Sequence, residues 1–276
     1  DLERIEADAD RERKAQQRRG QPGQRGGEAT RKLLFGEKNP CGKLAETWAK
    51  SYSDVPYGVN FSKTQIEVYK ESVFVGYRYY QKAKKQVAFP FGFGLSYTTF
   101  GYSDIKIEND GDKITVLANI TNTGNRSGAE IVELYVKAPK TDVSKPEKEL
   151  RGFTKVYLAA GESKEIAIAV NKSDLAYYNI KEKQYVLESG EYEFRLCSDS
   201  ETVKLSENIT IEGENVPSPY DKEIFDLYEN SPDKISDETF EKMSGLRIPA
   251  LPPVKPITQE SRFTDLQKTF MGKILF

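Results

Sequence analysis

The chemistry open to this 276-residue sequence is limited first by the absence of histidine. A Ser-His-Asp triad, a Cys-His pair and any metal site built on imidazole are therefore excluded. Acid–base chemistry would depend on carboxylates, lysines, tyrosines or the two cysteines. Because the sequence contains 43 aspartates and glutamates, composition alone does not single out a catalytic carboxylate.

The two cysteines, Cys41 and Cys197, lie far apart in the sequence. One disulfide could join them. We favour two unpaired, buried thiols in a cytosolic protein, because disulfides are rare in the cytosol.

Composition and charge bound the partners and the location. Hydrophobic residues make up 37% of the chain and charged residues 30%, which suits an ordinary core under a well-solvated surface. The net charge of −2 gives no general attraction for nucleic acid or an anionic membrane, so we expect neither partner. No apolar run reaches about 18 residues, and no basic-then-apolar leader follows Asp1. We therefore expect a cytoplasmic protein.

The elements that would position any site are mainly strands. Apolar residues alternate with polar ones along 101–213, and turn signals such as Asn122-Thr-Gly-Asn recur at short intervals. The alternating positions are Ile105, Ile107, Ile114, Val116, Ala118, Ile120, Val132, Leu134, Val136, Ile166, Ile168, Val170, Tyr192, Phe194 and Leu196. About seven short strands over roughly 110 residues predict an antiparallel two-sheet β-sandwich.

The first 36 residues divide into three pieces. Residues 1–19 are densely charged and have few apolar side chains, which predicts an exposed helix or a disordered lead-in. A nucleic-acid patch is disfavoured there, because acidic residues interleave the arginines and no aromatics accompany them. Residues 20–27 are Gly-rich, and their spacing favours a turn over a phosphate-binding loop. Residues 28–35 have helical spacing that ends at Gly36.

Residues 51–100 are rich in aromatic side chains and are interrupted by Gly and Pro. This pattern predicts neither a regular helix nor a sheet. Since aromatic rings bury large areas, we expect an extended segment that packs against something else.

The composition changes again after Gly213. Two short helices are expected over 220–228 and 236–245, with Ser236 as N-cap and Gly245 after the last turn of the second. Four prolines over 249–256 predict an extended strap, and a final helix is expected from Thr264.

Several motifs, in order, resemble the C-terminal part of the family 3 glycoside hydrolases of β-glucosidase type. Leu33-Leu-Phe-Gly-Glu-Lys-Asn-Pro-Cys-Gly-Lys-Leu44 is similar to LFGxxNPSGKLP, although Cys41 and Ala45 replace the usual Ser and Pro. Tyr69-Lys-Glu-Ser-Val-Phe-Val-Gly-Tyr-Arg-Tyr-Tyr80 resembles YxEGIFVGYRYY, and Phe89-Pro-Phe-Gly-Phe-Gly-Leu-Ser-Tyr-Thr-Thr-Phe100 resembles FPFGxGLSYTxF. Gly128-Ala-Glu-Ile-Val-Glu-Leu-Tyr-Val136 and Lys148-Glu-Leu-Arg-Gly-Phe153 follow the family's fibronectin type III-like domain.

The resemblance begins at about residue 20 and implies an architecture. It implies the end of an α/β-sandwich domain over 20–50 and an aromatic-rich linker over 51–100 that packs on catalytic domains. It further implies a fibronectin type III-like, immunoglobulin-like antiparallel sandwich over 101–213 and an extension with short helices over 214–276. Residues 1–19 do not fit, because the family has buried elements at this place. Either this lead-in is foreign to the family, or another chain supplies the upstream sandwich.

The resemblance also implies that this chain lacks catalytic residues. Family members hydrolyse β-glycosides with retention, using two carboxylates about 5 Å apart. The nucleophilic Asp is implied on an N-terminal barrel in a Ser-Asp-Trp-like motif, which this sequence lacks. The acid/base Glu is implied upstream of residue 20. We therefore assign no catalytic residue, no metal and no cofactor.

Four residues remain as candidates for substrate contact: Glu71, Arg78, Tyr79 and Trp48. For Glu71, a structural role in which it pairs with Arg78 or caps a turn is favoured over a sugar contact. Trp48 is expected to be a packing residue before a sugar platform. Tyr57, Arg78 and Tyr79 are expected to orient loops near the aglycone side of the family's pocket.

Three functions follow from these observations. The first is a non-catalytic C-terminal scaffold of a retaining β-glucosidase-like enzyme, with the barrel and α/β-sandwich domains as partners in cis or on another chain. The second is one piece of a split or nicked hydrolase that is active only with a barrel-bearing chain. The third is a stand-alone β-sandwich module that binds carbohydrate or protein. Burial of the aromatic segment against a partner would separate the first two functions from the third.

Overall fold

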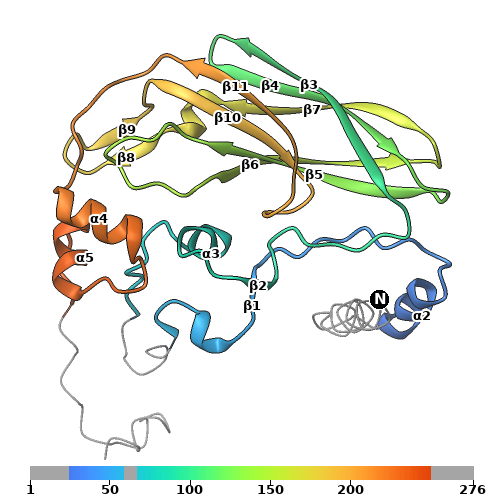
Figure 1. Ribbon diagram of the computed structural model, residues 1–276, viewed down its shortest axis with the longest axis horizontal. Helices are drawn as coiled ribbons and strands as arrows, with labels where there is room; N and C mark the ends of the chain where they lie inside the picture. The colour runs from blue at the N-terminus through green and yellow to red at the C-terminus, as the bar shows by residue number, and fades with distance from the viewer. Residues whose placement is uncertain (1–24, 59–66, 250–276) are drawn as a thin grey trace, which may run out of the picture.

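The computed structural model describes residues 25–58 and 67–249 (Figure 1). The predicted charged lead-in over 1–19, most of the Gly-rich turn, the strap beyond Pro249 and the final helix from Thr264 all lie outside the described residues.

A two-sheet β-sandwich forms the body of the molecule, as the alternation predicts (Figure 1). One sheet has the order β3-β4-β7, and the other has the order β11-β10-β5-β6, with every neighbouring pair antiparallel. The strands are β3 (Phe100–Asp110), β4 (Lys113–Asn122), β5 (Gly128–Lys137), β6 (Glu149–Leu158), β7 (Ser163–Asn171), β10 (Gly190–Cys197) and β11 (Val203–Ile211). The fold is therefore mainly β, and its fibronectin type III-like architecture is confirmed.

The core lies between the two sheets and is built from the alternating residues. Ile114, Val116 and Ile120 on β4 are fully buried, and Val116 pairs in register with Ile168 of β7. Val132 and Leu134 on β5 close the core from the other sheet. Alternation places these side chains on one face of each strand, so a register slip of one residue would expose all of them.

The outer face of the β5 sheet is covered by another part of the chain rather than left in solvent. Helix α3 (Tyr77–Lys82) and strand β2 (Val87–Phe89) lie beneath this sheet, and β2 pairs with β1 (Trp48–Ala49) (Figure 1). The prediction that 51–100 contains no regular helix or strand is therefore wrong at these places. The aromatic spacing does not match an amphipathic period, because the α3 tyrosines point to two different neighbours.

The aromatic segment also packs on the C-terminal extension. Phe74, Tyr79 and Tyr80 form a buried cluster with residues of α4 (Lys222–Asn230) and with Ile235. Much of the segment is therefore buried by this chain itself. Burial of these aromatics consequently does not separate a scaffold from a stand-alone binding module.

The short helices predicted within the described residues are present. Helix α4 (Lys222–Asn230) begins and ends two residues later than the predicted 220–228, and α2 (Gly26–Leu34) begins two residues before the predicted 28–35. Helix α2 ends before Gly36, which has a φ of 70°. Helix α5 (Asp237–Ser244) begins after Ser236, whose side chain accepts a hydrogen bond from Thr239 N, and it ends at left-handed Gly245. Two short turns, η1 (Tyr52–Asp54) and η3 (Lys172–Leu175), and a hairpin of β8 (Tyr177–Asn179) and β9 (Gln184–Val186) complete the described elements.

Both cysteines are unpaired, but only one of them is fully buried. Cys197 is buried in β10, and burial raises the pKa of its thiol to about 11. Cys41 is half-buried, which corrects the prediction of two buried thiols, and Lys155 Nζ donates to its sulfur at 3.1 Å. Among the helices of the described residues, none is long and apolar enough to span a bilayer.

Candidate functional site

A hollow of about 710 Å³ lies where 45–58 meets 67–80, and it collects some of the predicted contact residues. Glu71, Arg78 and Tyr57 line it, whereas Trp48 and Tyr79 do not. The structure therefore brings two of the four candidates into one concave surface and leaves the other two out of it.

Glu71 is a buried carboxyl at the edge of this hollow. Its side chain and backbone together are 8% exposed, and burial raises the pKa of its carboxyl above the ordinary value. Its backbone carbonyl accepts from Phe74 N at 3.0 Å, so residue 71 opens a turn through its backbone, and capping of that turn by its side chain stays a prediction.

The other structural interpretation, a Glu71–Arg78 pair, is not what the described residues show. Arg78 Nη2 lies 3.4 Å from Glu149 Oε1, and Arg151 Nη2 lies 2.5 Å from Glu149 Oε2. Glu149 on β6 is therefore shared by two arginines, one from α3 and one from its own strand. This ion-pair network joins the two motif segments 69–80 and 148–153 across the face of the sheet.

The two candidates outside the hollow have packing roles. Tyr79 is fully buried, and its ring makes an edge contact with Tyr80 at 5.2 Å between centroids. Trp48 makes an edge contact with Phe89 at 6.5 Å, and its Nε1 donates to Glu46 at 2.9 Å. Trp48 thus supports the pairing of β1 with β2, and Tyr79 packs α3 into the buried cluster that includes Ala49 and Val87.

Tyr57 ties the N-terminal side of the hollow to the C-terminal extension. Its hydroxyl donates to Pro232 O at 3.0 Å and accepts from Ile235 N at 2.8 Å. Burial raises the pKa of this phenol to about 12. Tyr57 is therefore a neutral bridging group at physiological pH.

Helix α3 is fastened to the sandwich at both ends. The Tyr77 hydroxyl accepts from Leu150 N at 2.9 Å, and the Tyr77 ring packs edge-on against Tyr135 with centroids 5.5 Å apart. At the other end, Gln81 Nε2 donates to Ser200 O. The position of the hollow is consequently set by the sandwich.

A buried carboxyl, Glu133, lies under the cover of the 91–93 segment. Glu133 is 4% exposed and accepts from Tyr135 Oη at 2.8 Å. Burial raises the pKa of its carboxyl to about 7, and the Tyr135 hydrogen bond and the nearby Lys43 oppose that shift. A Cβ on Gly92 would meet both carboxylate oxygens at 2.4 Å, so only glycine allows this close approach.

Large apolar side chains remain exposed around the hollow and on α2. Tyr69 is 70% exposed and Phe35 is 77% exposed, and they are accompanied by Leu34, Tyr52 and Val75. Exposed apolar surface of this kind marks interaction sites. The arrangement suits the binding of another protein surface better than acid–base chemistry. Within residues 25–58 and 67–249, no group of three or more Cys, Asp or Glu is placed to hold a metal ion.

Sequence reasoning did not single out Glu133, Glu149 and Arg151. Glu149 and Arg151 lie in the 148–153 motif, which indicated the fibronectin type III-like domain but no role for either side chain. Glu133 occupies the polar position of an alternating strand, where a solvated side chain is the ordinary expectation. A contact with a segment 40 residues away leaves no periodic signal in the sequence.

Two known protein families match separate parts of the chain. Residues 5–97 match the Glycosyl hydrolase family 3 C-terminal domain, and residues 130–200 match the Fibronectin type III-like domain. The first match starts at residue 5, so the prediction that the resemblance begins near residue 20 is wrong.

Curated relatives are similar over about two thirds of this chain. The chain is 44% identical over 194 residues to thermostable beta-glucosidase B of Acetivibrio thermocellus, covering 68% of this chain and 26% of that protein. It is 39% identical over 199 residues to an exo-alpha-(1->6)-L-arabinopyranosidase of Bifidobacterium breve, covering 71% and 26%. The chain thus spans about a quarter of the length of these relatives.

Solved structures of β-glucosidases are also similar to most of this chain, over a smaller part of their own. Beta-glucosidase 3B from Thermotoga neapolitana, in complex with glucose, has a TM-score of 0.66 at 40% identity, covering 70% of this chain and 28% of that one. A beta-glucosidase from Bifidobacterium adolescentis has a TM-score of 0.65 at 35% identity, covering 76% and 32%.

Proposed function

Since this chain carries the C-terminal region of a family 3 glycoside hydrolase, we propose that it is the non-catalytic scaffold of a retaining β-glucosidase-like enzyme. Its partners would be the catalytic barrel and the α/β-sandwich domain, in cis or on another chain. Its substrate, in that context alone, would be a β-glucoside.

The observation that carries this proposal is the combination of a firmly held α3 with exposed apolar side chains beside it. The Arg78–Glu149–Arg151 network and the Tyr77 contacts fix α3 to the sandwich, and Tyr228 of α4 donates to Lys70 O in the segment before it. Tyr69, Val73 and Val75 lie on the same segment and remain exposed. A rigid element that presents apolar surface loses little entropy when it docks, which suits a brace.

The substrate class is the finer part of the proposal. The relatives named above are described as a β-glucosidase and as an exo-α-(1→6)-L-arabinopyranosidase, although each is similar to this chain to nearly the same degree. A scaffold shared by enzymes with different sugars would leave the choice of sugar to the barrel. We therefore expect β-glucosides to be hydrolysed only when a β-glucoside-specific barrel is supplied.

The experiment is complementation with a barrel-bearing polypeptide. The region of the Acetivibrio β-glucosidase that precedes its match to this chain would be mixed with the purified chain and assayed on an aryl β-glucoside. We expect no turnover from this chain alone and a clear gain on mixing. Turnover by the chain alone that survives purification would overturn the non-catalytic assignment.

Two tyrosines of equal exposure give a matched test of the docking surface. Tyr69 beside the hollow and Tyr185 on β9 are each 70% exposed. Tyr69→Asp should reduce the gain on mixing at least tenfold, because a charge would be buried in the interface. Tyr185→Asp should leave the gain unchanged. Equal effects of the two substitutions would contradict the proposed surface.

A further inference from the structure

A second cavity lies beyond the Glu149 network, between the sandwich and the C-terminal extension. It has a volume of about 340 Å³, and the loop after β5, η3 with β8, and α4 contribute to its wall. An engineered apolar cavity of roughly 150 Å³ takes up benzene, so this larger volume suits a ligand of about two fused rings. Val73 and Tyr178 line the cavity and are 46% and 51% exposed, so it is open to solvent beside these two residues.

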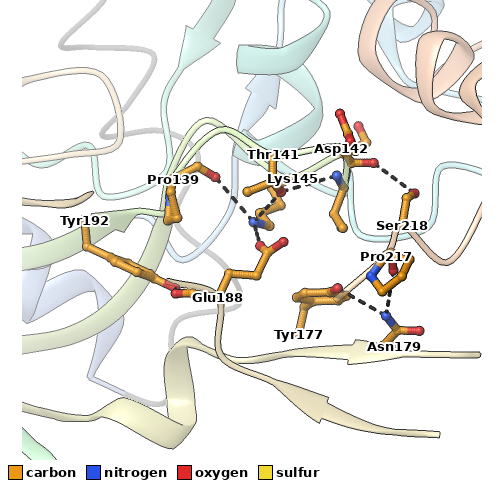
Figure 2. A network of polar contacts seen from close by, with 12 residues as sticks. Pro139, Thr141, Asp142, Lys145, Tyr177, Asn179, Glu188, Tyr192, Pro217 and Ser218 are labelled. Carbon is orange, nitrogen blue, oxygen red and sulfur yellow. Dashed lines mark hydrogen bonds and ion pairs between the residues drawn. The ribbon is translucent and has the colours of Figure 1, made fainter. Parts of the chain in front are cut away.

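The charged side chains in the wall of this cavity are paired with one another. Lys145 Nζ forms an ion pair with Glu188 and donates to Thr141 Oγ1 at 3.1 Å (Figure 2). Arg151 Nη2 lies 2.5 Å from Glu149 Oε2. The two cations and two anions of the wall therefore balance, and a charged ligand would lose its hydration without gaining an unpaired counter-ion. This balance favours a neutral ligand.

Three tyrosines of the wall already have partners for their hydroxyls. The hydroxyls of Tyr177, Tyr192 and Tyr228 form hydrogen bonds with Asn179 Nδ2, Glu188 O and Lys70 O. Figure 2 shows the contact of Tyr177 with Asn179. These three side chains therefore offer ring faces to a ligand rather than free hydroxyls.

Ring and aliphatic surface makes up much of the remaining wall. The tyrosine rings are joined there by Phe74, Val136, Leu175 and Ala176. Phe74 and Tyr228 are stacked, with ring centroids 6.2 Å apart. Aromatic pairs gain from offset or edge-to-face contact beyond the area that they bury. A flat aromatic ligand is therefore favoured over a saturated one of the same size.

We infer that this cavity binds a neutral, flat aromatic molecule of about two fused rings, held by ring and aliphatic surface. The inference depends on the cavity alone and not on the proposed scaffold role. The probe is 2-naphthol, which is uncharged at neutral pH. At the ligand efficiency usual for small molecules, its Kd is expected to be roughly 0.1–1 mM.

The experiment is a titration of the whole chain with 2-naphthol, followed by amide chemical shifts. We expect saturation, with shifts that move at residues 138–146 and 175–180. Decahydro-2-naphthol has the same two fused rings without their π-electrons, and it should bind about threefold to tenfold more weakly. The anion 2-naphthoate and the cation 2-naphthylmethylammonium should each bind at least tenfold more weakly than 2-naphthol, because the wall has no unpaired charge for them.

Two pairs of variants place the ligand in the cavity. Ala176→Phe should fill the cavity and weaken binding at least tenfold, whereas Ala167→Phe on the exposed face of β7 should bind normally. Tyr177→Leu removes one ring of the wall and should weaken binding about threefold to tenfold. Its control is Tyr185→Leu, since Tyr185 is 70% exposed and lies outside the wall.

Several outcomes would overturn the inference. They are no saturation with 2-naphthol, binding of a charged or saturated probe as tight as that of 2-naphthol, and shifts confined to the hollow around Glu71. Unchanged 2-naphthol binding in a folded Ala176→Phe variant would do the same. If Ala176→Phe does not fold, equal binding by Tyr177→Leu and Tyr185→Leu would overturn it.

Discussion

The two faces of strand β5 are built on different principles. Val132, Leu134 and Val136 point into the sandwich and belong to its hydrophobic core. Glu133 and Tyr135 on the opposite face are equally buried, but they meet a segment that lies 40 to 60 residues earlier in the sequence. The same strand thus takes part in a general hydrophobic core and in a specific polar contact.

The inner face of β5 stabilises the fold, and its outer face positions the candidate site. The inner face would tolerate apolar exchanges that keep volume, because its contacts are non-directional. The outer face depends on named partners: Tyr77 for Leu150, Arg78 for Glu149, and Gly92 for Glu133. The inner face makes a sandwich, whereas the outer face places α3 and the hollow.

The largest expected effect is loss of the inner core. Leu134→Ala should lower the free energy of unfolding by roughly 2–5 kcal/mol, because it removes a fully buried side chain and leaves a cavity. Chemical denaturation would measure this loss across the whole described fold. A cost under about 1 kcal/mol would show that the sandwich is not the stabilising unit.

The outer face should instead make stability depend on pH. Burial raises the folded-state pKa of Glu133 to about 7 from an ordinary 4.5, so the folded state binds more protons than the unfolded state between these values. The contribution of Glu133 to stability is present below pH 4.5 and is lost as pH rises to about 7, by roughly 3 kcal/mol.

Glu133→Gln should remove this dependence, because a neutral amide still accepts from Tyr135. Chemical denaturation at a series of pH values would measure how the free energy of unfolding depends on pH. The same substitution at exposed Glu191 provides the control and should leave the profile as it is. An unchanged slope in the Glu133→Gln variant would mean that the carboxyl is solvated.

A smaller effect separates close approach from backbone strain. Gly92 and Gly111 both have positive φ. A Cβ added at Gly92 would clash with the Glu133 carboxylate, whereas no atom lies within 4 Å of a Cβ added at Gly111. Both alanine variants should lose about 1 kcal/mol to strain, and Gly92→Ala should lose roughly 1–2 kcal/mol more. Equal denaturation midpoints for the two variants would contradict the close packing of the 91–93 segment on Glu133.

The smallest expected effect is a gain. Ser72 has a φ of 56° at the position where the family pattern has glycine. Ser72→Gly should relieve strain and stabilise the chain by about 0.5–1 kcal/mol. The covering segment would gain this stability, so its susceptibility to protease should fall more than that of the sandwich.

The sequence predicts the inner face well and the outer face poorly. The period-two alternation of apolar residues predicts the burial of Ile114, Val116, Ala118 and Ile120. The residue types Ser236 and Gly245 predict the two ends of a helix. The family motifs place Glu149 and Arg151 in a domain without revealing that Arg78 joins them. Contacts such as Gly92 with Glu133 depend on three-dimensional proximity, for which neither spacing nor composition provides a signal.

The most direct test of this account is hydrogen exchange of α3 and its flanks in the chain on its own. Ala83 N donates to Tyr79 O at 2.8 Å, and Lys85 N donates to Tyr80 O at 2.9 Å. If the sandwich holds this segment, these amides should be protected about as strongly as those of edge strand β6. Exchange at the rate of an unfolded peptide, while Leu134 and Val136 remain protected, would contradict the account.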